Sequence, residues 1–314
     1  SMKLWLDAQD LDTMDKGTTA GAIGTPTDGS DVKFWADKSG NGHHATSSAT
    51  PKYKANSLNG NLPSVATSAG TLTLTDSATK FGGWDSLSLI YVSQWDTGYQ
   101  QFEWNFNKGD PNTSQGFGIG KRRCIEHPQG IRFSPGDKQA SGATRAINSP
   151  IILSFIYDGS GGTIKFTANG SSAGTNTTSI PSLAANTSES IKFRNHERWG
   201  EILIYRNALS DTERQTIESH LAIKWGMTGN LPATHLFNTQ KGWSVGRGEK
   251  ENTLITNIKG TGEIEEASHS TALSTDNQWH HIVSTYDGGT RKIYLDGTEV
   301  SSASASGSVA STTA

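Results

Sequence analysis

Short apolar stretches alternate with polar, glycine-rich turns along most of the chain. Thr71 to Leu74 alternates polar and apolar positions, which is the period of a strand with one buried face. Leu87 to Val92 is an almost unbroken apolar run, as expected of a fully buried strand. Similar runs predict strands at Leu4–Leu6, Ile151–Tyr157, Ile164–Thr167, Ile191–Phe193 and Glu201–Tyr205. Many short strands separated by such turns are typical of an all-β sandwich.

One segment departs from this pattern and predicts a short helix. Ser210 and Glu213 have the spacing of a capping box, in which each side chain bonds the other residue's backbone N–H. An apolar stripe at positions i, i+4 and i+8 then runs from Ile217 to Trp225. Gly226 suits the residue after the helix. We expect the stripe to pack against the rim of the sandwich.

The chain also repeats part of itself at an offset of about 126–129 residues. Ser154–Gly170 and Val283–Gly297 share a Tyr-Asp-Gly turn, a strand and a second turn of Asn-Gly or Asp-Gly. Upstream, Gly116–Gly120 matches Gly242–Gly246. A constant offset over three matches indicates two copies of one structural unit.

The two copies are unequal. The predicted organisation is a complete jelly-roll domain over residues 3–228, a linker over 229–238 and a partial second copy over 239–314. The second copy has no counterpart of Leu87–Val92 or of Glu201–Tyr205, and missing strands leave exposed sheet edges. Either the sequence stops inside a second domain, which we favour, or other strands complete it.

Composition narrows the range of partners. The net charge of -3 over 314 residues provides no basic surface for nucleic acid. No apolar run approaches the roughly 20 residues that span a bilayer. Cys124 is the single cysteine, so no disulfide can form within the chain.

Four segments together resemble one known family of domains. They are Leu4–Ala8, Trp35–Ala45, Gly200–Ser210 with Trp225–Pro232, and Trp279–Gly288 with Lys292–Gly297. These segments resemble the LamG-like jelly rolls of the concanavalin A-like lectin/glucanase superfamily, of the kind found in large surface proteins of marine bacteria. The resemblance implies a concanavalin A-like jelly-roll sandwich, with one short helix closing its first domain. It also implies a secreted or cell-surface location, further domains in the same polypeptide, and glycan or an extracellular protein surface as the partner.

The opening segment contains a candidate calcium loop. Asp37, Ser39 and Asn41 place oxygen atoms at positions 1, 3 and 5, and Gly42 follows at position 6. Position 12 is Ser48 and not a bidentate Glu, so the loop is not an EF-hand. A further carboxylate would have to come from another strand.

The resemblance implies that Glu201 is this further carboxylate, with Asp7 and Asp10 as alternatives. Calcium would then be a structural ion that shapes the loop. The competing interpretation is an ordinary Gly/Asn turn in which Asp37 bonds local backbone N–H groups. The sequence leaves both open.

Two polar-aromatic stretches, Trp95–Asn105 and Arg194–Trp199, are candidates for sugar binding, which uses aromatic faces and polar side chains together. Strand alternation would place Trp104 on the same face as Phe106. The candidate ligand-binding residues are Trp95, Tyr99, Trp104, Arg194, His196 and Trp199. For each tryptophan the competing interpretation is a place in the core of the sandwich.

Catalysis has weaker support. Glu263 and Glu265 lie at alternate positions of a predicted strand, as the acid and nucleophile of some jelly-roll glycosidases do. They belong to the incomplete copy, and no aromatic-rich sequence surrounds them. We therefore expect a non-catalytic, extracellular binding or adhesion module that binds carbohydrate and is stabilised by calcium. The alternatives are a ligandless spacer domain and a polysaccharide hydrolase or lyase of the same fold.

Overall fold

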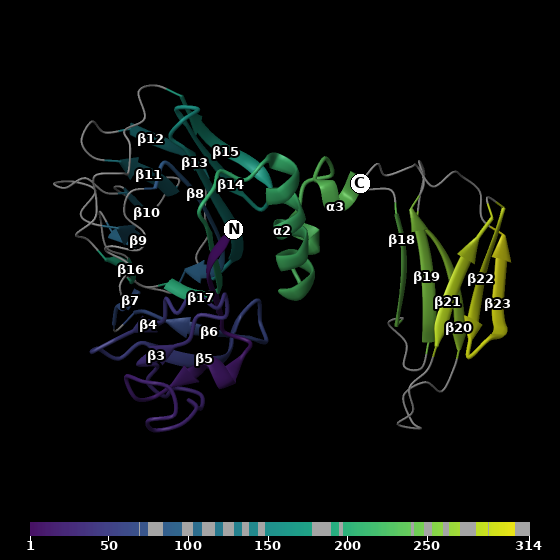
Figure 1. The fold of residues 1–314 in the computed structure, drawn as a ribbon, viewed down its shortest axis with the longest axis horizontal. Helices are drawn as coiled ribbons and strands as arrows, with labels where there is room; N and C mark the ends of the chain where they lie inside the picture. Colours follow the sequence, from purple (N-terminus) through teal and green to yellow (C-terminus); the bar gives the residue numbers. More distant parts are fainter. Residues whose placement is uncertain are drawn as a thin grey trace. The chain divides into compact units, whose positions relative to one another are not determined.

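The computed structural model divides the protein into two compact units, Ser1–Asn238 and Thr239–Ala314. The structure describes residues 1–68, 70–74, 84–95, 103–108, 117–121, 129–133, 138–143, 148–177, 190–194, 197–239, 242–247, 253–259, 264–270, 281–287 and 289–304. Both units consist mainly of strands (Figure 1).

The first unit is a sandwich of two antiparallel sheets. The eight-stranded sheet has the order β15 (Ser171–Asn176), β14 (Thr163–Ala168), β13 (Pro150–Asp158), β8 (Ser86–Trp95), β17 (Glu197–Tyr205), β6 (Leu62–Ala66) and β5 (Lys52–Leu58), and β1 (Met2–Asp7) also pairs with β17. The nine-stranded sheet has the order β12 (Lys138–Ala143), β11 (Gln129–Phe133), β10 (Phe117–Lys121), β9 (Glu103–Lys108), β16 (Ile191–Phe193), β7 (Leu72–Leu74), β4 (Ala45–Thr46), β3 (Phe34–Trp35) and β2 (Met14–Asp15). The predicted all-β fold of the jelly-roll type is confirmed.

A chain of aromatic rings crosses the core between the two sheets. Trp199 of β17 meets Tyr91 of β8 and Phe193 of β16 edge to face, at centroid distances of 5.3 and 5.4 Å. Phe193 in turn packs at 5.2 Å from Phe106 of β9. All four side chains are buried. Because β8 and β17 belong to one sheet and β9 and β16 to the other, these rings join the two layers.

Strand β17 changes its alternation at Gly200. Its register against β8 shifts between Trp199 and Glu201, which leaves Gly200 as the extra residue of a β-bulge. Trp199 and Ile202 are both in the core, whereas Glu201 bonds the end of the helix outside the sheet. A Cβ atom at position 200 would lie 2.9 Å from the Trp225 ring, so the close approach of this indole requires glycine.

The predicted helix is present as α2 (Asp211–Lys224). Both bonds of the capping box form: Ser210 Oγ accepts from the Glu213 N–H, and Glu213 Oε2 accepts from the Ser210 N–H. Gly226 follows the helix with a φ of +66°. The described chain also contains the short helix α3 (Leu236–Thr239) and 3-10 turns at Leu11–Thr13 and Thr228–Asn230. No helix among these residues is long and apolar enough to cross a membrane.

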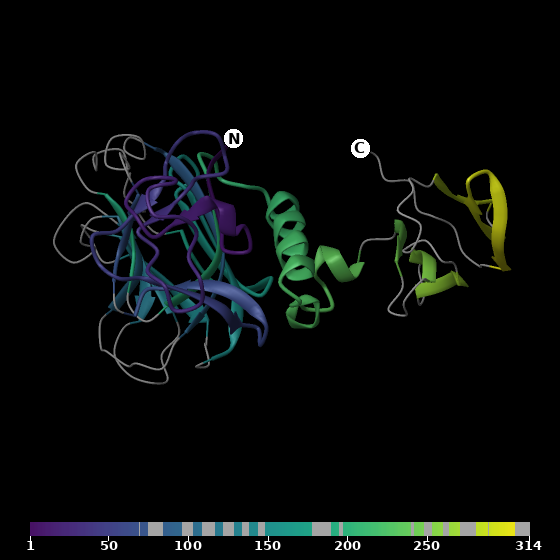
Figure 2. The same ribbon diagram turned by 90° about the horizontal axis from the view of Figure 1, so that it is seen from below.

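Helix α2 lies against the outer face of the eight-stranded sheet, and not against the rim as the sequence predicted (Figures 1 and 2). Its contact is built around Glu218, which is completely buried. Glu218 accepts from Ser154 of β13 at 2.5 Å and from Thr167 of β14 at 2.9 Å. Arg214 and His235 bond the second carboxylate oxygen at 2.5 and 3.0 Å. A shared hydrogen-bond network, in addition to the apolar stripe, therefore fixes the helix to the sheet.

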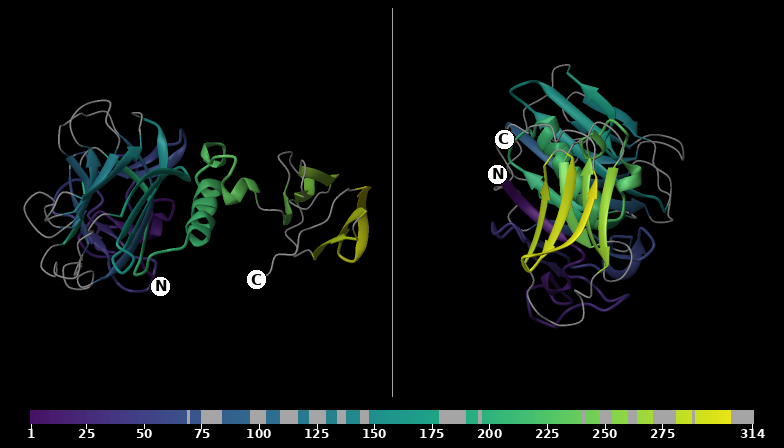
Figure 3. Two further views of the ribbon diagram at one scale, coloured as in Figure 1. Left: turned by 90° about the horizontal axis from the view of Figure 1, so that it is seen from above. Right: turned by 90° about the vertical axis from the view of Figure 1, so that its right-hand side faces the viewer.

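The second unit contains two three-stranded antiparallel sheets (Figure 3). One consists of β18 (Gly242–Arg247), β19 (Thr253–Lys259) and β20 (Ile264–Ser270), and the other of β21 (Ile282–Tyr286), β22 (Thr290–Leu295) and β23 (Thr298–Ser304). Ile282 is 36% exposed, whereas the repeat-equivalent strand β13 is buried over most of its length. Strands of similar sequence are therefore buried to different extents in the two units.

The repeated sequence forms the same turn in both units. Asn169–Gly170, between β14 and β15, has φ values of +47° and +77°. Asp296–Gly297, between β22 and β23, has +50° and +84°. In each turn the first side chain accepts a backbone N–H from the neighbouring strand, that of Ile152 at 2.9 Å and that of His281 at 2.8 Å. Strands β21–β23 therefore reproduce β13–β15. That the second unit is a partial jelly-roll copy stays a prediction.

Replacing Ser210 with Ala tests the role of the capping box. The variant leaves the N–H of Glu213 without its acceptor, and we expect the free energy of unfolding to fall by about 1 kcal/mol. Urea unfolding followed by intrinsic fluorescence measures this change. The control is Thr216→Ala, which removes only an exposed hydroxyl bonded within α2 and introduces a better helix former. An equal fall in the free energy of unfolding in both variants would contradict a stabilising role of the capping box.

Candidate functional site: a polar pocket on the eight-stranded sheet

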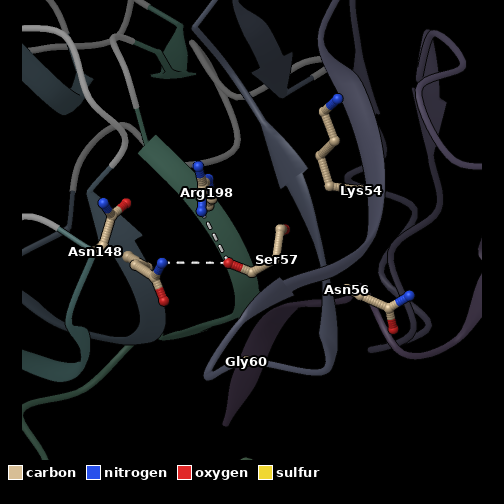
Figure 4. A pocket seen from close by; sticks show the side chains of 7 residues that line it. Lys54, Asn56, Ser57, Gly60, Asn148 and Arg198 are labelled. Atoms are coloured by element: carbon tan, nitrogen blue, oxygen red, sulfur yellow. Dashed lines mark hydrogen bonds between the residues drawn. The ribbon is translucent and has the colours of Figure 1, made fainter.

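A polar pocket of about 550 Å³ lies beside the β5–β6 hairpin (Figure 4). Its lining combines three amide side chains, two cationic side chains, a serine and a glycine. These residues are Asn56, Gln94, Asn148, Lys54, Arg198, Ser57 and Gly60. They come from β5, the β5–β6 turn, β8, β17 and the segment before β13. Among the described residues, no acidic or aromatic side chain lines the pocket.

Strand alternation places the pocket on the outer face of the sheet. Arg198 and Gln94 lie opposite each other in the ladder of β17 and β8. Trp199, the next residue of β17, is completely buried in the core. Because neighbouring residues on a strand point to opposite faces, Arg198 points outward. The floor of the pocket is therefore a sheet whose other side is packed.

An irregular stretch of β5 forms one wall. The ladder with β6 loses its register between Lys54 and Leu58. Within this stretch the carbonyl of Ser57 accepts from Arg198 Nη1 at 3.0 Å and from Gln94 Nε2 at 3.2 Å. Figure 4 shows Arg198 reaching Ser57 across the pocket. These two bonds fasten the wall to the floor.

The β5–β6 turn is held in a left-handed conformation. Asn59 and Gly60 have φ values of +46° and +84°, which asparagine and glycine tolerate best. The Asn59 amide donates to the carbonyl of Trp225 at 2.8 Å. Its backbone N–H donates to Gln94 Oε1 at 3.3 Å. Both ends of the Gln94 amide are thus bonded, so its orientation is fixed.

The remaining lining side chains supply charge and exposed amides. Lys54 is half-buried, and no described carboxylate forms an ion pair with it. Asn56 and Asn148 are exposed. Asn148 has a φ of +57°, and its N–H donates to the carbonyl of Trp95 at 3.1 Å. The pocket can therefore offer positive charge, donors and acceptors to a polar molecule.

Two of the tryptophans proposed to bind sugar are buried. Trp199 has no exposed surface, and its indole N–H donates to Thr67 Oγ1 at 3.1 Å. Trp95 is 9% exposed at the end of β8. These are the core positions that the sequence left as the competing interpretation. Arg194, directly after β16, is half-buried and does not line the pocket.

Other sequence candidates lie wholly or partly outside the described structure. Tyr99, His196 and Glu263 are outside the described residues. Trp104 in β9 and Glu265 in β20 are described by their backbone alone. The register of β9 against β10 shifts between Trp104 and Phe106, so the strict alternation predicted for β9 is interrupted there. The ligand-binding and catalytic roles of these residues stay predictions.

The proposed calcium loop has an internal hydrogen-bond network. Asp37 Oδ1 accepts from the backbone N–H groups of Trp5 and Ser39 at 2.9 and 2.8 Å. Its Oδ2 accepts from the Ser39 hydroxyl at 2.8 Å and from the His43 N–H at 3.0 Å. The Asn41 amide donates to the Ser39 hydroxyl at 2.8 Å. Asp37 thus bonds local N–H groups, as the turn interpretation expects.

Glu201, the carboxylate proposed to complete the calcium site, is bonded elsewhere. Its Oε1 accepts from the indole N–H of Trp5 at 2.8 Å. Its Oε2 accepts from the indole N–H of Trp225 at 2.8 Å and pairs with Lys224 at 2.7 Å. Glu201 is 1% exposed, so the two indoles and the ammonium group replace its hydration.

Two lysines link Glu201 to the other proposed carboxylates. Lys224 also pairs with Asp7 at 2.9 Å, and Lys38 pairs with Asp7 at 3.0 Å and with Asp10 at 2.7 Å. Ammonium groups therefore occupy the positions between these carboxylates. Among the described residues, no three His, Cys, Asp or Glu side chains converge as a metal site. In this arrangement the donors of the loop and Glu201 do not fit a shared calcium ion.

The ion pairs control the protonation of this cluster. Burial alone would raise the pKa of Asp7, but the hydrogen bond and charge of Lys224 and the bond from Lys38 hold that pKa below its usual value. Burial alone would lower the pKa of Lys38, but its bonds to Asp10 and Asp7 hold that pKa above its usual value. Both partners are therefore charged at neutral pH, and the cluster joins β1, the loop after β3, β17 and the end of α2.

The pocket residues gave little signal in the sequence. Arg198 lies within the Arg194–Trp199 stretch selected as a candidate, but the arginine itself was not singled out. Lys54, Gln94 and Asn148 are far apart in the sequence, and only the strand pairing brings them together. The Asn59–Gly60 turn was the one local pattern that could have indicated a hairpin here.

Glu201→Gln tests the ionic cluster. The amide keeps the shape of the side chain but sets an NH₂ group against an indole N–H or Lys224 and removes the ion pair. We expect the free energy of unfolding to fall by about 2–4 kcal/mol, measured by urea unfolding. The control is Lys165→Gln, whose exposed pair with Asp211 at 3.4 Å contributes at most about 1 kcal/mol. A loss no larger than that of the control would show that the cluster does not stabilise the fold.

Calcium dependence is tested by melting the protein with calcium chloride and with a chelator. An ion that binds only the native state raises the melting temperature. We expect no shift, because the oxygens of Asp37 and Glu201 already have partners within the protein. A rise of several degrees with calcium would overturn this expectation and support the calcium site proposed from the sequence.

Comparison with known proteins identifies a family for part of the chain. Residues 216–314 match the laminin-G family model described as the concanavalin A-like lectin/glucanases superfamily. Among curated proteins, none matches this sequence.

Solved structures give distant likenesses. Domain 4 of AbnA, a GH43 extracellular arabinanase from Geobacillus stearothermophilus, in complex with arabinotriose, is 13% identical, with 68% of this chain and 96% of that chain covered and a TM-score of 0.47. The botulinum neurotoxin serotype C1 binding domain is 12% identical, with 94% and 78% covered and a TM-score of 0.49. At these values the ligands of those proteins say nothing about this chain. The family match over residues 216–314 and the antiparallel sandwich confirm the resemblance to this superfamily that the sequence shows.

Proposed function

We propose that the protein is a non-catalytic carbohydrate-binding module and that the polar pocket of the first unit is its binding site. The observation that carries this proposal is a pocket of about 550 Å³ whose described lining side chains, apart from Ser57, are amides or cations. Its volume lies within the range of about 300–1,000 Å³ typical of small-molecule sites. A saccharide presents hydroxyl groups that both donate and accept hydrogen bonds, which amide side chains match.

The pocket is organised before a ligand arrives. Gln94 is bonded at both ends of its amide, and Arg198 is tied to the carbonyl of Ser57. The wall and floor therefore need little ordering on binding, and less of the interaction energy is lost to conformational entropy. This supports a recognition role for the pocket beyond a surface depression between strands.

The carboxylates of the described structure support binding over hydrolysis. A glycosidase needs two carboxylates that flank the substrate, one of them able to donate a proton. Glu201, Asp7 and Glu218 are buried and engaged by lysine or arginine. No described carboxylate lines the pocket. We propose that the module serves recognition or adhesion outside the cell, as the family resemblance implies.

A glycan array probed with the full chain, with and without chelator, tests the proposal. We expect saccharide binding in both conditions. Asn148→Gly removes an exposed amide while keeping the left-handed backbone, and it should weaken a bound glycan about three- to tenfold. The matched control is Asn169→Gly, another left-handed asparagine that does not line the pocket. No binding to any glycan in either condition would overturn the proposal in favour of a ligandless spacer.

A further inference from the structure

We infer that Asn59 is a positioning residue of the binding pocket, through which the C-terminal end of α2 sets the shape of the pocket wall. This inference rests on the proposed function of the pocket and concerns the control of that same site. Asn59 does not itself line the pocket. Its hydrogen bonds connect the β5–β6 turn to the end of the helix on one side and to a lining side chain on the other.

The side chain of Asn59 holds the turn against the end of α2. Its Nδ2 donates to the carbonyl of Trp225 at 2.8 Å and to the carbonyl of Gly226 at 3.1 Å. The last carbonyls of a helix have no partner within the helix, so the Asn59 amide caps the C-terminus of α2. Because both bonds start from one amide nitrogen, the position of the turn depends on the position of the helix end.

The backbone of the same residue orients a side chain of the lining. The Asn59 N–H donates to Gln94 Oε1 at 3.3 Å, and Gln94 Nε2 donates to the carbonyl of Ser57 at 3.2 Å. These two bonds point Oε1 toward the turn and Nε2 toward β5. A saccharide hydroxyl that reaches Gln94 therefore meets an acceptor and a donor in fixed places. Displacement of the turn would release Oε1 and change this pattern.

The helix end is a firm anchor for the turn. Trp225 is completely buried, and its indole N–H donates to Glu201 Oε2 at 2.8 Å. Its ring lies so close to Gly200 that a Cβ atom there would be 2.9 Å away. The end of α2 therefore cannot shift without breaking these contacts. A continuous path of contacts runs from Trp225 through Asn59 to Gln94, so a change at the helix end reaches the pocket.

The left-handed backbone limits which residue can make this connection. Asn59 has a φ of +46°, a conformation that glycine, asparagine and aspartate adopt more readily than other residues. Glycine has no amide to donate. Aspartate would set a carboxylate against the carbonyl oxygens of Trp225 and Gly226, which the asparagine amide now bonds. These two residue types therefore remove the connection while they keep the turn.

A glycan array read at increasing protein concentration tests the inference with the full chain. Asn59→Gly keeps the backbone N–H but loses both bonds to the helix end, and we expect each array saccharide that binds the unaltered chain to bind about three- to tenfold more weakly. The matched control is Asn169→Gly, which also loses a side-chain bond at a left-handed turn but does not line the pocket. It should bind as the unaltered chain does. Circular dichroism checks that both variants are folded.

Asn59→Asp separates the lost hydrogen bonds from a general loss of stability. At neutral pH its carboxylate cannot donate, so binding should be at least as weak as in Asn59→Gly. A carboxyl of aspartate titrates near pH ~4, and its protonated form can donate to one of the two carbonyls. The affinity of Asn59→Asp relative to the unaltered chain should therefore rise as the pH falls from about 7 to about 4. The relative affinity of Asn59→Gly should stay constant over this range.

The outcomes separate the inference from the proposed function. Binding that Asn148→Gly weakens and Asn59→Gly leaves unchanged would overturn the inference and leave carbohydrate binding in the pocket standing. Equal weakening by Asn59→Gly and Asn169→Gly would also overturn it, because a general loss of stability would then explain both. So would a relative affinity of Asn59→Asp that does not change with pH. No binding of the unaltered chain to any glycan would overturn the proposed function and the inference together.

Discussion

The bulge at Gly200 is the constraint on which the rest of the first unit depends. It inserts one residue into β17, so that Trp199 and Ile202 both face the core while Arg198 and Glu201 both face outward. Regular alternation would have placed Trp199 and Glu201 on one face, and either the aromatic chain or the ionic cluster would have been lost. The close approach of the Trp225 ring leaves no space for a side chain at this position. Glycine is therefore required here by packing as well as by the bulge.

The bulge also divides the outer surface of β17 into two areas with different chemistry. On one side of Gly200, Glu201 is enclosed by two indoles and a lysine, and its charge is fully compensated. On the other side, Arg198 lines the pocket and donates to the carbonyl of Ser57. The ionic cluster fixes β1 and the end of α2 to the strand, and the Asn59 amide bonds the carbonyl of Trp225. The chain after the helix thus supports the turn that closes the pocket.

The sequence predicted what depends on local chemistry. The capping box at Ser210, the Gly226 helix end and the repeated Asn-Gly and Asp-Gly turns are determined by residues close together in the chain, and the structure contains all of them. The bulge and the pocket could not be predicted, because they depend on which strands become neighbours. Glu201 illustrates the limit: the sequence indicated an acidic residue near the opening loop, but not that Lys224, at the end of a distant helix, would neutralise it.

In the two repeated segments, similar local sequence gives the same strand pairing and turns, whereas the burial of the strands depends on their neighbours. Strands β13–β15 and β21–β23 share their pairing, their second turn and the bond from that turn to the neighbouring strand. Their burial differs because β13 also pairs with β8 and packs against the core, while among the described residues β21 pairs with β22 alone. The pocket does not belong to the repeat. Its described lining comes from β5, the β5–β6 turn, β8, β17 and the segment before β13, and all of these lie outside the repeated segments. The repeat of the hairpin unit therefore does not repeat the pocket, and the binding role proposed for this pocket concerns the first unit alone.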